Sequence, residues 1–153
     1  MDDAGAPLEP RELRAWMAFL AAGHLIEHEV ERQLKRAGGL SHPEFEVLLR
    51  LSAAEGERMR MSDLAREVMV SKSRLTYQVT QLERAGLVKR TACESDRRSV
   101  WAELTDAGTA ALAAVRPGHR EVVREVLIEV LTPEEIDLLG DALSRVAGRL
   151  RER

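Results

Sequence analysis

The sequence predicts a mainly α-helical chain that carries one small β-hairpin. Apolar residues recur at helical spacing near both ends of the chain, over residues 10–36 and 133–150. Two short strand-like runs, 87–91 and 100–104, flank a charged loop in the second half. The chain has 153 residues, of which 44% are hydrophobic, so we expect one domain with a sizeable core.

A long first helix and a shorter second helix are expected at the start of the chain. The first spans residues 10–36 and ends at the glycine pair 38–39, because glycine favours the backbone turn that closes a helix. Ser41 and Glu44 form a capping box, so a second helix begins there. The apolar face of the first helix consists of Leu13, Trp16, Met17, Phe19, Leu20, Ile26, Val30 and Leu34. The inward residues of the second helix are Phe45, Leu48, Leu49 and Leu51.

A helix-turn-helix is predicted in the middle of the chain. Ser62 is expected to cap a short helix over residues 63–68, and Ser71 to cap a longer helix that Gly86 ends. Apolar residues at i, i+4 and i+7 turn one side of the longer helix inward and leave a polar side outward. The inward residues are Leu64, Ala65 and Val68 in the short helix and Leu75, Val79 and Leu82 in the longer one. The polar side carries Ser73, Tyr77, Thr80 and Arg84.

Two further helices are expected after the hairpin. Thr105 caps the first of them, which reaches about Leu131. The run 132–135 starts the second, since it combines a threonine cap, a proline in the first turn and an acidic third position. Apolar residues of the second helix then form a narrow seam suited to packing on another helix, at Ile136, Leu139, Leu143, Val146 and Leu150. Terminal helices with this much apolar surface favour a homodimer.

Positive charge is concentrated in the middle of the chain. The whole sequence carries a net charge of −3. Residues 58–98 contain ten Lys or Arg against five Asp or Glu, a net of +5, which leaves −8 for the rest. A basic middle on an acidic chain fits a module that faces DNA.

The polar side of the longer helix and the hairpin loop supply the candidate DNA contacts. Ser, Thr, Tyr, Gln and Arg side chains can reach base edges and phosphates, although most polar helix faces are simply solvated. Loop arginines can reach the neighbouring backbone or the minor groove. The residues expected to contact double-stranded DNA are Ser62, Ser71, Lys72, Ser73, Arg74, Thr76, Tyr77, Gln78, Gln81, Arg84, Arg97 and Arg98.

The hairpin loop carries a motif that points to a known family. The motif consists of the helix end LERAGLV at 82–88 followed by Asp96, Arg97, Arg98, Leu104, Thr105 and Gly108. Together these residues resemble the MarR family of bacterial winged-helix regulators, over about residues 11–149. The resemblance implies that Arg98 enters the minor groove and that Asp96 supports the wing, as the hairpin is called in this fold.

The resemblance also implies an architecture and a function. One MarR-like domain, residues 1–153, would hold a winged helix-turn-helix over 43–104 between dimerisation helices at 10–37 and 105–151. Its function would be sequence-specific regulation of transcription, most often repression by a homodimer at a pseudo-palindromic operator, relieved by a small ligand. Two-fold symmetry of the protein then matches two-fold symmetry of the DNA site.

Three smaller features are candidate ligand or sensing sites. In some relatives a tryptophan of the first helix and an acid of the second bind a small aromatic anion, so Trp16 and Glu46 are candidates here, although such a tryptophan is more often a core residue. His24 and His28 lie one turn apart and could bind zinc, yet such pairs are more typical of a helix surface, so we expect no metal and no cofactor. Cys93 lies in the wing, whereas peroxide-sensing relatives use a cysteine in the first helix, so thiol sensing is not expected.

Other functional classes find little support in the sequence. We find no nucleophile, base and acid in a recognisable motif and no glycine-rich phosphate loop, so the chain is not expected to be an enzyme. With no signal peptide, no membrane span and one cysteine, we expect a cytoplasmic protein associated with the nucleoid and no membrane partner. The alternatives are a winged helix for architectural DNA binding or protein–protein contact, and a ligand-binding protein that does not bind DNA.

Overall fold

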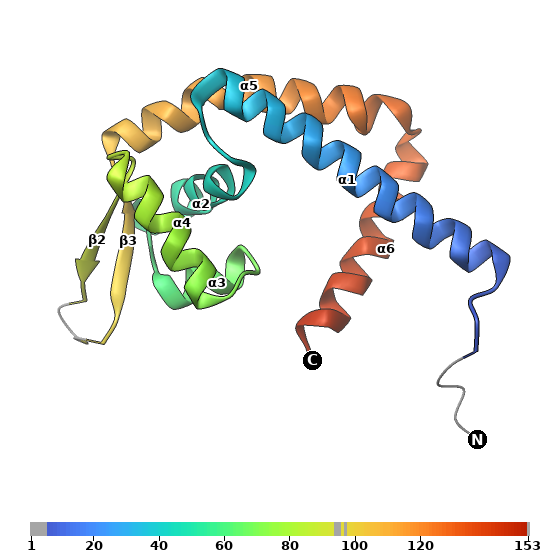
Figure 1. The fold of residues 1–153 in the computed structure, drawn as a ribbon, viewed down its shortest axis with the longest axis horizontal. Helices are drawn as coiled ribbons and strands as arrows, with labels where there is room; N and C mark the ends of the chain where they lie inside the picture. Colours follow the sequence, from blue (N-terminus) through green and yellow to red (C-terminus); the bar gives the residue numbers. More distant parts are fainter. Residues whose placement is uncertain (1–5, 94–95, 97, 153) are drawn as a thin grey trace. The chain divides into compact units, whose positions relative to one another are not determined.

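The computed structural model describes all residues except 1–5, 94, 95, 97 and 153 (Figure 1). Within the described residues, six α-helices and three short strands confirm the mainly α fold with a small sheet. The helices are α1 (Pro10–Gly38), α2 (His42–Ala53), α3 (Met61–Glu67), α4 (Lys72–Arg84), α5 (Asp106–Val126) and α6 (Pro133–Arg151). The strands are β1 (Arg58–Arg60), β2 (Val88–Ala92) and β3 (Val100–Leu104). Two 3₁₀ turns occupy Glu55–Glu57 and Ile128–Val130.

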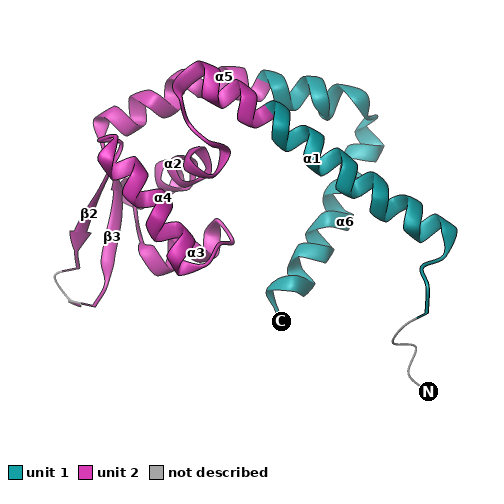
Figure 2. Cartoon of the chain, viewed as in Figure 1, with its two compact units in different colours: residues 1–29, 121–153 teal, residues 30–120 magenta. Residues whose placement is uncertain are grey.

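The chain divides into two compact units (Figure 2). The central unit is Val30–Arg120, and the terminal-helix unit combines the residues up to Glu29 with those from Glu121 onward. Every described residue that is fully buried, from Val30 to Val115, belongs to the central unit. The terminal-helix unit instead leaves large apolar side chains exposed, among them Leu13, Trp16, Met17, Phe19, Leu25, Leu138, Leu143, Val146 and Leu150.

The helix starts follow the local capping signals. At α2 the Ser41 amide donates to Glu44 Oε2 at 2.8 Å and the Glu44 amide donates to Ser41 Oγ at 3.3 Å, which confirms the predicted capping box. The same reciprocal pair joins Thr132 and Glu135 at the start of α6. The first helix, predicted to stop at residue 36, runs two residues further and stops where Gly39 adopts a φ of 69°.

The sheet has three strands, in the order β1-β3-β2, and not the two that were predicted. The β2–β3 hairpin forms as expected, with Val88 opposite Leu104. The unpredicted strand β1 pairs antiparallel with β3 and places Arg60 opposite Trp101. Val88, Ala102 and Leu104 are buried on the inner face, so the sheet closes one side of the core.

Three further expectations are wrong in detail. Ser62 does not cap α3, because β1 runs directly into this helix and the extended Arg60 takes the cap position without a side-chain bond. Helix α5 ends at Val126 and not near Leu131, since the residues before Pro133 must leave the helical conformation and a 3₁₀ turn intervenes. In α2, Val47 is buried and Leu49 is only half-buried.

Helix α2 occupies the middle of the central unit, which explains its wide buried surface. It contacts α3, α4, β1 and β3, so apolar residues on more than one of its faces are covered. The predicted inward residues of α3 and α4 are confirmed, because all six are buried.

The start of α5 is locked against the turn that follows α4. Thr105 donates its amide to the Leu87 carbonyl at 3.1 Å and its hydroxyl to the Gly86 carbonyl at 2.7 Å. Its oxygen in turn accepts the Gly108 amide at 3.0 Å, which confirms Thr105 as the cap of α5. A Cβ at Gly108 would lie 2.1 Å from the Leu87 carbonyl oxygen, so only glycine permits this approach.

We expect Gly108→Ala to lower the free energy of unfolding by at least about 2 kcal/mol, because a backbone carbonyl cannot move aside as a flexible side chain can. Helix propensity alone would favour the alanine by about 1 kcal/mol, so the two effects have opposite signs. Urea unfolding at one fixed protein concentration measures the change. The control Ala110→Ser, on the exposed side of α5, should stay within about 0.5 kcal/mol of wild type. A Gly108→Ala protein as stable as wild type would contradict the lock.

Candidate nucleic-acid interface

Helix α4 is held at its start and along its inner side. The Ser71 hydroxyl accepts the Arg74 amide at 3.2 Å and lies 3.2 Å from the Ser73 hydroxyl, so the cap prediction is confirmed. Leu75 and Leu82 are 1% exposed and Val79 is fully buried, which fixes the rotation of the helix about its axis. The opposite face of α4 therefore points away from the core.

Most of the predicted contact residues lie on this exposed face. The exposed residues are Ser71, Lys72, Ser73, Arg74, Thr76, Tyr77 and Arg84 of α4 and its cap, together with Ser62 of α3, while Gln81 is half-buried. Tyr77 is the large hydrophobic side chain that α4 exposes, with 66% of its surface accessible. The Thr76 hydroxyl donates to the Lys72 carbonyl at 2.8 Å, so it presents acceptor lone pairs and a methyl group outward.

Gln78 does not lie with the other candidates. Only 6% of its surface is exposed, because position 78 falls three residues after Leu75 and four before Leu82, on the inward stripe of the helix. Its Oε1 atom accepts no hydrogen bond from the described residues. The Gln78 side chain lines a cavity of about 450 Å³ between α4 and the start of α2, together with Tyr77 and Glu44.

Asp96 organises the wing turn through the backbone. Its carboxylate accepts the Ser99 hydroxyl at 2.7 Å and the Arg98 amide at 3.0 Å, and its carbonyl accepts the Ser99 amide at 2.9 Å. The hydrogen bonds from Ser99 and from the Arg98 amide lower the pKa of Asp96, so the carboxylate stays ionised. Asp96 thus holds the backbone of Arg98 and leaves the exposed Arg98 side chain available. Arg97 lies outside the described residues.

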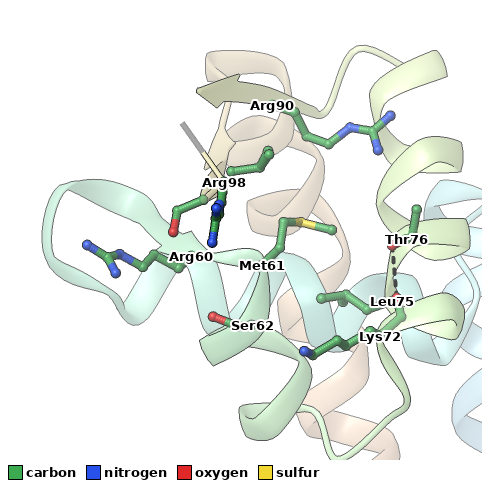
Figure 3. A pocket seen from close by; sticks show the side chains of 10 residues that line it. Arg60, Met61, Ser62, Lys72, Leu75, Thr76, Arg90 and Arg98 are labelled. Carbon is green, nitrogen blue, oxygen red and sulfur yellow. Dashed lines mark hydrogen bonds between the residues drawn. The ribbon is translucent and has the colours of Figure 1, made fainter. Parts of the chain in front are cut away.

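A cavity of about 400 Å³ brings α4, β1 and the wing together (Figure 3). It is lined by Arg60, Met61, Ser62, Lys72, Leu75, Thr76, Arg90, Arg98, Ser99 and Val100, and none of these described lining residues is acidic. Four of them are cations contributed by four different segments of the chain. Arg60 and Arg90 were not among the predicted site residues, and Arg60 was missed because its strand was missed.

Ion pairing sorts the cations of the basic segment into two groups. Arg90 is held by Glu83, with Nη2 2.6 Å and Nε 3.1 Å from Glu83 Oε2, and this hydrogen bonding lowers the pKa of Glu83. Lys89 and Arg58 pair with Glu103, and Arg66 pairs with Asp63. In the part of the chain that the structure describes, no carboxylate forms an ion pair with Arg60, Lys72, Arg74, Arg84 or Arg98. The unpaired cations lie on α4, in the wing and at the end of β1.

The structure gives less support to the predicted effector and metal sites. Trp16 is half exposed and stacks on Phe19 at 6.1 Å in the terminal-helix unit, whereas Glu46 is half-buried in the central unit. His24 and His28 are exposed, and the described residues contain no group of three or more His, Cys, Asp or Glu side chains placed to hold a metal. Among the helices of the described chain, none is both long and apolar enough to cross a membrane.

Comparisons with known proteins agree with this geometry. The model of the MarR family matches residues 40–100. AbsC, a MarR family transcriptional regulator from Streptomyces coelicolor, is 42% identical in its crystal structure, with a TM-score of 0.93 over 97% of this chain and 100% of that chain. Sco3205, a MarR family regulator from the same organism solved in complex with DNA, is 36% identical, with a TM-score of 0.92 over 95% of this chain and 91% of that chain.

A further relative is also a regulator of transcription. The HTH-type transcriptional repressor YetL of Bacillus subtilis (strain 168) is 32% identical over 128 residues, which span 81% of this chain and 73% of that protein. All three of these relatives are regulators of transcription. The resemblance carried by LERAGLV and the wing motif is therefore confirmed, and the chain belongs to the MarR family of transcriptional regulators.

Proposed function

We propose that this protein is a homodimeric, sequence-specific DNA-binding repressor. The observation that carries the proposal is the cavity at which Lys72 of α4 and Arg98 of the wing meet, with no acidic residue among its described lining. Unpaired cations on a surface cost free energy through mutual repulsion, and a polyanion that lies across them relieves it. Support comes from Sco3205, a 36% identical relative that was solved in complex with DNA.

The two parts of the surface would do different work on DNA. Helix α4 enters a major groove, where Arg74 and Tyr77 reach base edges and the Ser71 region reaches phosphates. The wing lies over the flanking backbone, with Arg98 in or beside the minor groove. Base contacts then supply specificity, and the unpaired cations supply most of the salt-sensitive affinity.

The dimer would form through the terminal helices. Apolar side chains of α1 and α6 are exposed in the terminal-helix unit, and burying them against a second copy removes them from water. We further propose that residues 1–153 act as one MarR-like domain, with 10–37 and 105–151 as dimerisation helices and 43–104 as the DNA-binding region. Two α4 helices related by two-fold symmetry then read a pseudo-palindromic operator.

A small effector could release the repressor. Trp16 and Glu46 are the candidate contacts for a small aromatic anion, on the strength of the resemblance described above. We place the protein in the cytoplasm, associated with the nucleoid through its DNA.

Genomic footprinting with the purified protein tests the proposal as a whole, because a regulator protects a small set of related, two-fold symmetric sequences. Affinity for the protected sequence should exceed affinity for random duplex DNA by at least about 10³ at the same salt concentration. Protection spread evenly over the genome would indicate architectural binding instead.

We expect Arg74→Ala and Tyr77→Ala to weaken binding to the protected sequence by about 1–3 kcal/mol and binding to random DNA by much less, because base contacts discriminate between sequences. Fluorescence anisotropy on both duplexes gives the comparison. Arg116→Ala, which removes an exposed charge from α5, serves as the control for the loss of one cation. Equal losses on the two duplexes would mean that Arg74 and Tyr77 touch only the backbone.

We expect Arg98→Ala to weaken binding across many sequences and to reduce the slope of log affinity against log salt by about one unit, as for one lost phosphate contact. Asp96→Ala should give a smaller loss of the same kind, because Asp96 orders the backbone of Arg98 without touching its guanidinium. An unchanged salt slope in Arg98→Ala would remove the wing from the interface.

We expect Leu143→Asp to dissociate the dimer, because it would place an unpaired carboxylate in an apolar seam. In the single chain the side chain of Leu143 is 39% exposed, so the monomer should still fold with an aspartate at this position. Ser144→Asp, which adds the same charge beside the seam on α6, is the matched control and should remain dimeric. Light scattering at micromolar concentration decides the matter, and a monomeric wild type would refute the proposed assembly.

A further inference from the structure

The outer face of the sheet contains an aromatic ring that contacts two cations. Trp101 of β3 lies under two arginines of β1, with Arg58 Cζ 4.8 Å and Arg60 Cζ 5.6 Å from the centroid of its ring. The register explains the arrangement, because Arg60 pairs directly opposite Trp101 and Arg58 opposite Glu103, which puts all four side chains on one face. Contacts at these distances are attractive cation–π interactions.

The two arginines differ in what else they contact. Arg58 Nη1 lies 3.9 Å from Glu103 Oε1, and the pKa of Glu103 is lowered by its hydrogen bonds with Thr91 and Lys89, so this carboxylate is ionised. Glu103 also pairs with Lys89 at 3.1 Å, so it offsets part of the charge of Arg58. Arg60 has no ion-pair partner among the described residues. Of the two, Arg60 has more of its charge available for an external anion.

Arg60 also lies in the right place. Arg60 is a lining residue of the cavity that Lys72 of α4 and Arg98 of the wing also line, so three unpaired cations from three segments border one cavity. In Figure 3 the guanidinium of Arg60 points away from Lys72. Its charge also reaches the wing turn, where it contributes to the lowered pKa of Asp96 after the larger effects of the Ser99 and Arg98 hydrogen bonds. Arg60 thus lies where α4 and the wing approach each other.

We infer that Arg60 is a further DNA contact, which binds a backbone phosphate, and that Trp101 is the residue that positions it. The inference rests on the proposed function. A cation–π contact attracts the charge of a guanidinium to the ring and uses none of its N–H groups as hydrogen-bond donors to an acceptor atom, so these groups can still bind phosphate. A free arginine loses rotamer entropy when it is held in place, and the contact with the Trp101 ring restricts the side chain before DNA binds.

The surroundings allow Arg60 to be tested cleanly. Although Arg60 occupies the cap position of α3, its side chain makes no cap hydrogen bond, so truncation leaves the start of that helix unchanged. Arg58 provides a matched control, because it lies on the same strand, over the same ring and with the same charge, but is paired with Glu103. The two alanine variants therefore separate a phosphate contact from a general change of charge.

The first experiment measures affinity for a mixed-sequence duplex of about three helical turns between about 50 and 200 mM salt. A mixed sequence suffices because phosphate contacts do not depend on the base sequence. Arg60→Ala should reduce the salt slope by about one unit and lower affinity on the order of tenfold, as for the loss of one charged hydrogen bond. Arg58→Ala should change both quantities much less. Equal effects of the two variants would overturn the role of Arg60.

The second experiment tests Trp101 by a double-mutant cycle. Trp101→Leu should weaken binding in the wild-type background and have no further effect in Arg60→Ala, whereas Trp101→Phe, which keeps an aromatic face, should restore most of the affinity. Additive losses would overturn the positioning role and show that Trp101 acts independently of Arg60. Thermal melting checks that each variant is folded. Should Trp101→Leu unfold, Trp101→Phe keeps the test, because the small loss that it causes in the wild-type background should disappear in Arg60→Ala.

Different results would refute the proposed function and the role of Arg60. A wild-type protein that does not bind duplex DNA at about 50 mM salt would overturn the proposed function and, with it, the role of Arg60. A wild type that binds with a steep salt slope, together with an Arg60→Ala variant that matches Arg58→Ala, would overturn only the further inference.

Discussion

The buried stripe of α4 is the constraint on which the exposed surface of this helix depends. Leu75, Val79 and Leu82 are at most 1% exposed, and α4 packs on α2, α3 and β2. Burial of such side chains contributes about 1.5–3 kcal/mol each, so the rotation of the helix is set by its inner side. The outer residues have no comparable part in stability. They can therefore vary without changing the fold.

Carboxylates inside the basic segment decide which of its cations remain available. Glu83 pairs with Arg90 and links α4 to β2. Glu103 pairs with Lys89 and Arg58 on the outer face of the sheet. Three of the remaining cations, Arg60, Lys72 and Arg98, lie where α4, β1 and the wing meet. A net charge of −3 for the chain is thus compatible with DNA binding, because local pairing and not total charge sets the potential at the interface.

Local signals in the sequence predicted most of the fold. They did not predict features that depend on contacts between segments distant in the sequence. Capping boxes such as Ser41 with Glu44 act between neighbouring residues, so they can be recognised without a structure. Strand β1 has three residues, two of them arginine, and is a strand only because β3 lies beside it. Missing β1 also concealed Arg60 and its contact with Trp101. Gln78 is different, since its place on the inward stripe follows from helical spacing alone and could have been predicted.

The division of the chain into two units has a consequence for stability. The central unit contains all of the fully buried residues that the structure describes, whereas α6 contributes none. Helices that bury little within one chain are marginal on their own, since most helical stability in proteins comes from packing. If the terminal helices pair as proposed, their order depends on association and so on protein concentration. The same pairing links two α4 helices, so that binding of the first half-site raises the effective concentration of the second. Mutations in the seam of α6 would then weaken DNA binding without touching a single DNA contact.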